Sequence, residues 1–505
     1  MNLGENESVD VVVLGGGPGG ATLATLVALR GHRVVLLERH RFPRYQIGES
    51  LLPSTIHGIC RMLGVYQEVE NAAFMRKAGG TFRWGKQPEP WTFAFVDAPG
   101  LRESGAGFAY QVERSKFDAL LLDNAKRKGV DVREQCSASK LVQDGGRVAS
   151  VQYTDDTGRE REIRARFVVD ASGNQSRFFD LVGERVYSKL FQNVAMFGYF
   201  KNGRRLPAPN QGNILCVAFE LGWFWYIPLT AELTSVGAVI AKEHASKIQG
   251  DPEAGLLRLV QACPLVRDYL AEATRITEGQ YGQVRVRKDY SYCNTRFWAP
   301  GLALVGDSAC FIDPVFSSGV HLATYSGLLG ARSINSCLEG SMDETRAMEE
   351  FERRYRLEFG VYYDFLMAFY DMEQNTDSYF WQARRVLHTE ETKNEAFIRL
   401  VAGVGTAPAD FFAMRQGIGA SFSTAVQAID ADSDPGNKTV EKEAFEQAVH
   451  KVRLDDQVSL WRDLIHQGLE GVPPVEAPSS SNALVPSPDG LSWCIAPSVQ
   501  PGEAV

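Results

Sequence analysis

The sequence has no surplus of positive charge and no long apolar run. Its 505 residues include 53 Lys and Arg against 62 Asp and Glu, a formal net charge of −9. This acidic balance argues against nucleic acid or an anionic membrane as the main partner, because both attract basic surfaces. No uninterrupted apolar stretch approaches the roughly 20 residues that a membrane-spanning helix needs. We therefore expect a globular chain without a membrane segment.

Paired cysteine motifs are also missing. The eight cysteines are scattered along the chain, and none forms a Cys-x-x-Cys pair, which argues against the common zinc and redox motifs. A disulfide framework is not expected in so long a chain, so we predict buried, reduced thiols and no metal site. Residues 1–10 are polar and acidic and lack the features of a secretory signal, so we expect a cytoplasmic protein.

The sequence does contain a strand, a glycine loop, a helix and a second strand in succession. Residues 9–14 are β-branched and apolar, as buried parallel strands are. Residues 21–30 have the pattern of a helix, which Gly31 ends, and residues 33–37 form a second apolar run. This order predicts a βαβ unit.

The loop between the first strand and the helix has the pattern of a dinucleotide-binding site. Gly15 permits a tight turn, Gly17 lets the backbone approach a pyrophosphate, and Gly20 lets the helix and strand pack closely. The helix N-terminus favours the negative phosphates. Glu38, at the end of the second strand, is placed to accept a hydrogen bond from a ribose hydroxyl.

Two later segments extend this interpretation from dinucleotides in general to FAD. Asp307 follows an apolar strand late in the chain, where it can reach the ribityl hydroxyls of FAD, although it could also be a helix N-cap. The segment Gln111-Val112-Glu113-Arg114 resembles the Arg-bearing segment of flavin monooxygenases and halogenases, and this resemblance implies that Arg114 contacts the flavin phosphates or ribityl chain. The alternative for Arg114 is an ion pair with Asp118 at the start of a helix.

The run Gly222–Pro228, with the sequence Gly-Trp-Phe-Trp-Tyr-Ile-Pro, is the most unusual in the chain. In a strand, side chains alternate between faces, so Trp223 and Trp225 should point the same way. Two indoles on one face make a rigid, bulky wall.

The start of one predicted helix is a further candidate binding site. Ser318 and Gly319 precede an apolar helical segment, so unpaired backbone N–H groups are expected there. Such groups can hold a halide or a flavin carbonyl oxygen; an ordinary N-cap is the alternative. His321 is interpreted as a packed histidine rather than a catalytic one.

The pattern along the chain predicts an α/β fold with several regions. Segments near residues 117–128, 166–170 and 302–305 should return to the nucleotide-binding sheet, whereas aromatic, alternating stretches should form a separate antiparallel sheet on the substrate side. The Pro- and Ser-rich end should have little fixed structure. The regions are 1–71, 111–185 and 291–340 for FAD binding, 72–110 and 186–290 for the substrate-side sheet, 341–470 for C-terminal helices, and 471–505 for the tail.

The glycine loop together with the Trp-x-Trp-x-Ile-Pro run resembles the flavin-dependent halogenases. The resemblance covers about residues 9–400 and implies an FAD-binding Rossmann-like fold of the p-hydroxybenzoate hydroxylase type. It also implies that a separate flavin reductase supplies FADH2, which with O2 oxidises chloride or bromide to hypohalous acid. The wall would then separate the flavin from an aromatic substrate.

The resemblance assigns two further residues. Lys77, just before Gly79-Gly80-Thr81-Phe82, matches the essential lysine of the family, which directs the hypohalous acid onto the substrate. A desolvated amine can hydrogen-bond that acid or react with it. Lys86 is the nearby rival for this role. Ser50, in Gly48-Glu49-Ser50, matches the loop that lies over the flavin ring.

One departure from the family pattern limits the substrate. Tryptophan halogenases have a glutamate at the position that Phe316 occupies here. Without that carboxylate to orient a developing positive charge, the substrate must activate itself, as phenols and pyrroles do. The resemblance therefore favours the phenol and pyrrole branch of secondary metabolism, whose aromatic substrates are free or attached to a carrier protein.

Three alternatives share the glycine loop and fold. A flavin aromatic hydroxylase would need NAD(P)H and open access from flavin to substrate, and the two indoles argue against that access. An FAD-dependent reductase of isoprenoid lipids would need an apolar groove. The third alternative is a flavin-binding protein without turnover.

Overall fold

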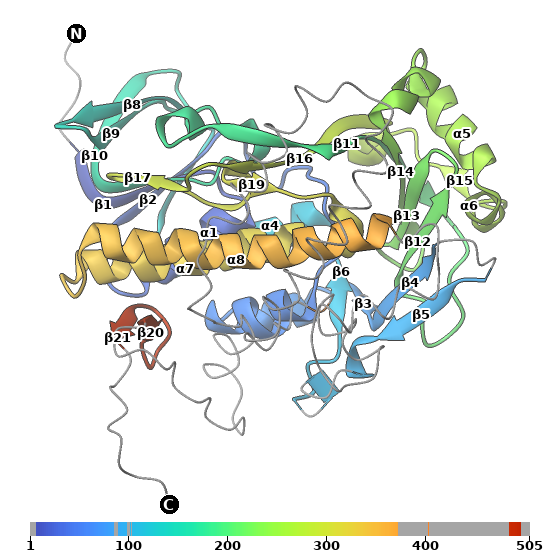
Figure 1. Ribbon diagram of the computed structural model, residues 1–505, viewed down its shortest axis with the longest axis horizontal. Coiled ribbons are helices and arrows are strands. Elements are labelled where there is room, and N and C mark those ends of the chain that lie inside the picture. The colour runs from blue at the N-terminus through green and yellow to red at the C-terminus, as the bar shows by residue number, and fades with distance from the viewer. Residues whose placement is uncertain are drawn as a thin grey trace, which may run out of the picture.

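The computed structural model describes residues 7–84, 89–97, 101–102, 104–371, 402 and 484–495. Two large sheets lie at opposite ends of the molecule, and two long helices run along its length between them (Figure 1). The α/β architecture predicted from the sequence is confirmed.

The first sheet is mainly parallel and contains the predicted βαβ unit. Strand β1 pairs in parallel with β2 and β10, and β10 pairs in parallel with β18. Val11, Val12 and Val13 are fully buried, as the side chains of an inner parallel strand are expected to be. The strands are β1 (Glu7–Leu14), β2 (Val34–Glu38), β7 (Asp131–Glu134), β8 (Ser137–Asp144), β9 (Arg147–Thr154), β10 (Glu160–Asp170), β17 (Trp298–Ala299) and β18 (Leu302–Leu304).

The second sheet is mainly antiparallel and carries the two tryptophans. Its strand order is β19-β16-β11-β14-β13-β12-β4-β5, with β15 beside β11. The strands are β4 (Gly79–Arg83), β5 (Trp91–Ala94), β11 (Arg185–Lys201), β12 (Ile214–Phe219), β13 (Gly222–Pro228), β14 (Leu233–Ala241), β15 (Thr274–Arg275), β16 (Arg285–Asn294) and β19 (Cys310–Phe311). A separate pair joins β3 (Met75–Lys77) to β6 (Ala109–Gln111).

Helices connect and cover the sheets. Helix α1 packs against α7, and α7 packs against α8, which reaches the tryptophan strand with its C-terminal end (Figure 1). No helix of the described residues is long and apolar enough to cross a membrane. The helices are α1 (Pro18–Ala28), α2 (Tyr66–Asn71), α4 (Arg114–Arg127), α5 (Pro252–Ala262), α6 (Pro264–Tyr269), α7 (Gly319–Leu338), α8 (Glu344–Asp371) and the π-helix η1 (Ser54–Cys60).

The second sheet separates two cores. Trp223, Trp225 and Ile227 belong to the main core, whereas Phe224 and Tyr226 belong to a second core beneath α5 and α6. This alternation follows directly from the two-residue period of a strand. The prediction that both indoles share one face is therefore confirmed.

The C-terminal region differs from expectation. Residues 484–495 form a hairpin of β20 (Leu484–Pro486) and β21 (Trp493–Ile495), so the prediction of an unstructured tail does not hold there. Trp493 is buried; its indole N–H donates to Ser333, and the Arg354 guanidinium lies 4.5 Å from its ring centroid. Composition alone missed this because one buried tryptophan outweighs the surrounding Pro and Ser.

The remaining region boundaries, at residues 71, 110, 185, 290, 340 and 470, stay predictions. The helical region begins as predicted with α8, but residues 372–470 apart from 402 lie outside the described residues. None of the eight cysteines, which all lie among the described residues, forms a disulfide bond, and seven are buried, which agrees with the expectation of reduced thiols. Cys494, on the hairpin, is the exposed one.

Candidate active site

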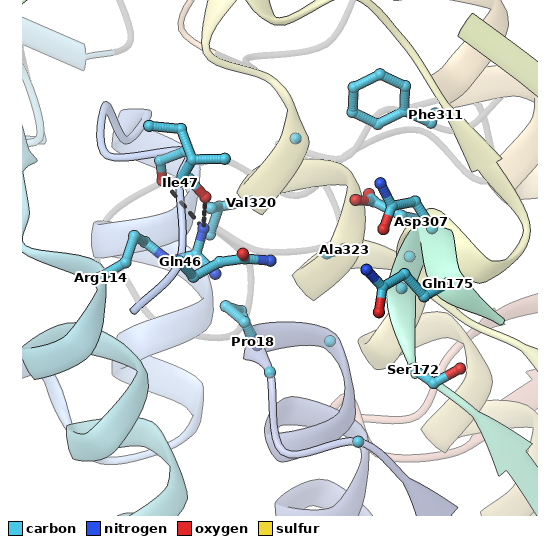
Figure 2. A pocket seen from close by; sticks show the side chains of 18 of the residues that line it. Pro18, Gln46, Ile47, Arg114, Ser172, Gln175, Asp307, Phe311, Val320 and Ala323 are labelled. Atoms are coloured by element: carbon cyan, nitrogen blue, oxygen red, sulfur yellow. Dashed lines mark hydrogen bonds between the residues drawn. The ribbon is translucent and has the colours of Figure 1, made fainter. Parts of the chain in front are cut away.

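A cavity of about 690 Å³ extends from the glycine loop to the two tryptophans. Its size lies in the range of ordinary cofactor and ligand pockets. Figure 2 shows Pro18 at the start of α1 facing Asp307 and Gln175 across this space, with Arg114 on another side. The predicted cofactor residues Gly15, Gly17, Glu38, Ser50, Arg114 and Asp307 all line the cavity.

The three loop glycines have different surroundings. Gly15 has a φ of +107°, and a Cβ on Gly20 would lie 2.0 Å from the Gly15 carbonyl oxygen, so neither position tolerates a side chain. Gly20 lies behind the loop and does not line the cavity. Gly17 faces open space, and only the tip of Arg44 would approach a Cβ there, at 3.5 Å. The loop can therefore bring its backbone against a phosphate, and Arg44 adds positive charge.

Glu38, at the end of β2, hydrogen-bonds the backbone of the glycine loop. Its Oε2 accepts a hydrogen bond from the Gly16 amide at 2.7 Å, and its Oε1 accepts one from the His40 amide at 2.8 Å. The carboxylate is buried at the cavity edge, where a ribose hydroxyl could share it. Its cofactor contact stays a prediction.

Arg114 forms the ion pair and also lines the cavity, whereas its contact with the flavin stays a prediction. Its Nε and Nη2 bind the Asp118 carboxylate at 2.7 and 3.0 Å, which is the predicted ion pair. Its Nη1 also donates to the carbonyl of Ile47 at 2.7 Å and to that of Gly48 at 3.1 Å (Figure 2). Arg114 thus fixes the loop before Ser50 while lining the cavity.

Asp307 lies at the opposite side of the cavity, after β18. Burial raises the pKa of its carboxyl to about 6, and the positive charges of Arg114 and Arg185 partly offset that rise. A carboxylate so placed is able to accept hydrogen bonds from sugar-like hydroxyls. These features suit the ribityl chain of FAD.

The tryptophan wall, Trp223 and Trp225, forms the far end of the cavity. The ring centroids lie 6.2 Å apart with the planes at 55°. Gly237, opposite Trp225 on β14, makes room for the indole because a Cβ there would lie 2.3 Å from Trp225 Cζ2. Trp225 Nε1 donates to Ser235 Oγ at 3.1 Å. The wall is thus seated by a mid-strand glycine and tied by a hydrogen bond.

Lys77 lies just outside the cavity lining. Ser50, which lines the cavity, connects the two through a hydrogen bond with Lys77. Its Nζ donates to Ser50 Oγ at 2.9 Å and to the Leu51 carbonyl at 3.0 Å, and the amine lies 5.5 Å from the Phe95 ring centroid. The side chain is only 2% exposed, and burial lowers the pKa of the amine to about 7. Lys86, the rival, lies outside the described residues.

Cys216 is the neighbour of Lys77 on the wall side. It pairs with Trp225 across β12 and β13, so the two side chains share one sheet face. Burial raises the pKa of its thiol, and the positive charge of Lys77 opposes that rise. Lys77 is therefore packed against a neutral thiol rather than a carboxylate.

The predicted halide residues lie at the N-terminus of α7. Gly319 and the preceding Ser317 line the cavity, whereas Ser318 is buried and does not. Ser318 caps the helix without a side-chain hydrogen bond, so first-turn N–H groups remain available. The halide assignment stays a prediction. His321 bonds Ser54 Oγ and Glu358 Oε1, both at 2.9 Å, as a packed histidine would.

An aromatic cluster occupies the region around Phe316. The Phe316 and Phe369 ring centroids lie 4.8 Å apart, and Phe369 also contacts Trp84 at 4.4 Å. Trp84 in turn lies 6.4 Å from Trp223. No hydrogen-bonding group replaces a glutamate at position 316, because phenylalanine fills the space with a ring.

Sequence reasoning missed four residues that shape the site. Gly237 and Ser235 seat the wall, Glu49 is a buried cavity carboxylate, and Asp313 holds Tyr370 next to Trp223. The lone glycine inside an apolar strand was a usable signal for close packing. The other contacts join residues far apart in sequence, and no local pattern marks them.

Comparison with known proteins gives a consistent family. The model of the tryptophan halogenase family matches residues 10–101 and 97–432. The chain is 36% identical over 409 residues to the tryptophan 2-halogenase of Chondromyces crocatus, covering 79% of this chain and 76% of that one. It is 34% identical over 375 residues to the flavin-dependent halogenase gsfI of Penicillium aethiopicum, covering 69% and 68%.

A solved structure extends the similarity to three dimensions. The myxobacterial chondrochloren halogenase CndH, titled as a variant of FAD-dependent halogenases, is 53% identical and superposes with a TM-score of 0.75. The match covers 97% of this chain and 100% of CndH. Enzymes of this family use FAD in its reduced form with a halide, and they generally need a separate flavin reductase and an aromatic substrate. The glycine loop, the cavity and the buried Lys77 fit that chemistry, and the chain belongs to the flavin-dependent halogenases.

Proposed function

We propose that this chain halogenates an electron-rich aromatic, a phenol or a pyrrole, in secondary metabolism. The observation that carries the proposal is the place of Lys77: buried, one side chain beyond the flavin cavity and beside the tryptophan wall. Phe316 supports the choice of substrate because no carboxylate stands at its position to activate a less reactive ring.

The cavity residues would hold FAD as follows. The glycine loop and Arg44 bind the pyrophosphate, Glu38 the ribose, and Asp307 the ribityl chain. Reduced FAD, when bound, would supply two of the four electrons that reduce O2, and the halide, oxidised to hypohalous acid, would supply the other two. The backbone amides at Gly319, at the cavity edge, would hold the halide ion.

The residues beyond the cavity direct the product of that step. The tryptophan wall keeps the aromatic substrate away from the flavin. A molecule as small as hypohalous acid can still pass from the flavin side to the lysine side. Lys77 with a pKa near 7 holds a large neutral fraction at neutral pH, so its amine can hydrogen-bond hypohalous acid or react with it. Either way the electrophilic halogen is presented to the substrate from one direction.

A direct assay tests the proposal. The full chain is mixed with photoreduced FAD, O2 and bromide or chloride, and phloroglucinol, pyrrole or a carrier-bound pyrrole is the substrate. We expect a halide-dependent product by mass spectrometry. Lys77→Ala should abolish the product while reduced FAD is still consumed, and Lys116→Ala, whose side chain is 61% exposed, serves as the matched control.

Other outcomes would contradict the proposal. Halogenation of free tryptophan faster than of any phenol or pyrrole would overturn the substrate assignment. No product with any of these compounds, or a fully active Lys77→Ala variant, would overturn the role of the site. NAD(P)H oxidation by the protein alone would instead support an aromatic hydroxylase.

A further inference from the structure

The two indoles of the tryptophan wall are held from different parts of the fold. Trp225 Nε1 donates to Ser235 on the neighbouring strand of the same sheet, at 3.1 Å. Trp223 Nε1 donates to the hydroxyl of Tyr370 at 2.6 Å, and Tyr370 lies at the C-terminal end of α8. Of the two indole bonds that the described residues show, that of Trp223 joins the wall to another layer of the molecule.

The Tyr370 hydroxyl also hydrogen-bonds a buried carboxylate, that of Asp313. The hydroxyl donates to Asp313 Oδ2 at 2.9 Å, and Asn193 Nδ2 donates to the same oxygen at 3.0 Å. The backbone N–H of Val315 donates to Asp313 Oδ1 at 3.1 Å. Asp313 is only 1% exposed, so these hydrogen bonds are what make its burial tolerable.

Asp313 also lies at the start of the segment that leads to α7. It caps the short turn Pro314–Phe316, after which Ser317 adopts a left-handed φ of +61° and α7 begins at Gly319. One carboxylate therefore connects three parts of the site: the Trp223 indole through Tyr370, strand β11 through Asn193, and the cavity edge at Ser317 and Gly319.

The Tyr370 ring is held in place by packing. Its centroid lies 5.1 Å from that of Phe191 and 5.7 Å from that of Trp84, both in edge-on geometry. A ring fixed in this way holds its hydroxyl at one position, so the bond to Trp223 has a defined direction.

We propose that Asp313 and Tyr370 are positioning residues that fix the Trp223 indole relative to the start of α7. The inference rests on the proposed function, since it assigns them the task of keeping the passage between cavity and lysine narrow. When the anchor is lost, the indole gains freedom and hypohalous acid escapes to solvent before it reaches Lys77. The yield of halogenated product per reduced FAD then falls, although the oxidation of FAD does not slow.

Two variants break the anchor in different ways. Tyr370→Phe keeps the packed ring and removes the hydroxyl, and Asp313→Asn keeps the shape and removes the charge. Tyr362→Phe is the matched control: it lies on the same helix, is buried, and its hydroxyl has no hydrogen-bond partner among the described residues. Thermal unfolding of each variant separates folding defects from positioning effects.

The first readout is the fate of the halogen. With photoreduced FAD, O2, bromide and phloroglucinol, we expect Tyr370→Phe to yield about fivefold less brominated phloroglucinol per FAD oxidised, the factor for one lost hydrogen bond. Phenol red in solution, a trap for escaped hypobromous acid, should brominate faster in parallel. Asp313→Asn should act in the same direction and Tyr362→Phe should match the wild type.

The second readout does not need turnover. In a ¹⁵N-indole NMR spectrum, with the Trp223 signal assigned by Trp223→Phe, Tyr370→Phe should shift the Trp223 N–H signal upfield and Tyr362→Phe should leave it in place. An unmoved signal overturns the anchor, and an unchanged product yield with a moved signal overturns its role in positioning. A wild type that brominates neither compound counts against the proposed function, and the NMR shift then still decides the anchor.

Discussion

The two sides of the tryptophan wall differ in nearly every physical respect. The flavin side is an open cavity of about 690 Å³ lined by backbone amides and by charged groups such as Glu38, Arg44 and Asp307. The lysine side is packed with rings, and burial lowers the pKa of the Lys77 amine there to about 7. The first side suits a large, anionic and exchangeable cofactor, and the second suits a small, neutral electrophile.

This contrast teaches how one chain handles two incompatible requirements. Reduced FAD needs hydrogen-bond donors and positive charge, which would also solvate and consume a reactive halogen species. In the proposed function, the tryptophan wall separates these two environments. The sides meet at Ser50, which lines the cavity and accepts a hydrogen bond from Lys77.

The largest expected effect comes from a variant that weakens FAD binding and leaves the lysine side unchanged. Gly20→Ala would place a Cβ about 2 Å from the Gly15 carbonyl, so the loop must move. We expect FAD affinity to fall about 100-fold, or roughly 3 kcal/mol, measured by fluorescence titration. Lys77→Ala should bind FAD like the wild type, and equal losses in both variants would show that the two sides are not independent.

Displacing the wall is the next largest change. Gly237→Ala puts a methyl group within 2.5 Å of both Trp225 and Phe197, so we expect a loss of about 1–3 kcal/mol in the free energy of unfolding. Urea denaturation measures this loss. The double variant Gly237→Ala/Trp225→Phe should recover part of the stability because a phenyl ring is smaller than an indole; no recovery would place the strain elsewhere.

Groups on both sides titrate between pH 6 and pH 8: Lys77 on the lysine side and, on the flavin side, Asp307, whose pKa burial raises to about 6. Because burial lowers the Lys77 pKa to about 7, the amine is mostly neutral above that pH and mostly protonated below it. If the neutral amine is the active form, product formation should fall about tenfold from pH 8 to pH 6. Reduced FAD consumption, followed in parallel, is the control, and a flat product profile would contradict the assignment.

The smallest expected effect comes from the Ser235 bond to Trp225. Ser235→Ala leaves the indole N–H without its acceptor, at a cost of about 1 kcal/mol in the free energy of unfolding. Thr234→Ser, at the adjacent buried position, is a suitable comparison because it keeps a hydroxyl. A stability change in Ser235→Ala no larger than in Thr234→Ser would mean that packing alone holds Trp225.

Local patterns predicted the flavin side well and the lysine side in part. The βαβ unit follows from adjacent residues, because the glycine loop needs Gly15, Gly17 and Gly20 within a single turn and Glu38 at the end of the next strand. The alternation that places Trp223 and Trp225 on one face is equally local. Such features depend on residues that are close in sequence, so one sequence suffices to find them.

Contacts between distant segments could not be predicted in this way. Lys77 was identified only through its family resemblance, and its bond to Ser50 comes from the pairing of β3 with β6. The path from Trp223 through Tyr370 to Asp313 joins a strand, a helix end and a turn. The composition of the C-terminal tail likewise hid the docking of Trp493, because composition averages over the one residue that decides it.

Burial next to the wall has opposite consequences for the reactivity of two neighbours. Exclusion of water favours the uncharged form of every ionisable group, so it turns the Lys77 ammonium into a free amine and keeps Cys216 as a thiol rather than a thiolate. The amine gains a lone pair, whereas the thiol is denied the form in which sulfur attacks oxidants fastest. If Lys77 has the proposed role, the same solvent effect favours the amine over the thiol as the group that meets the halogen.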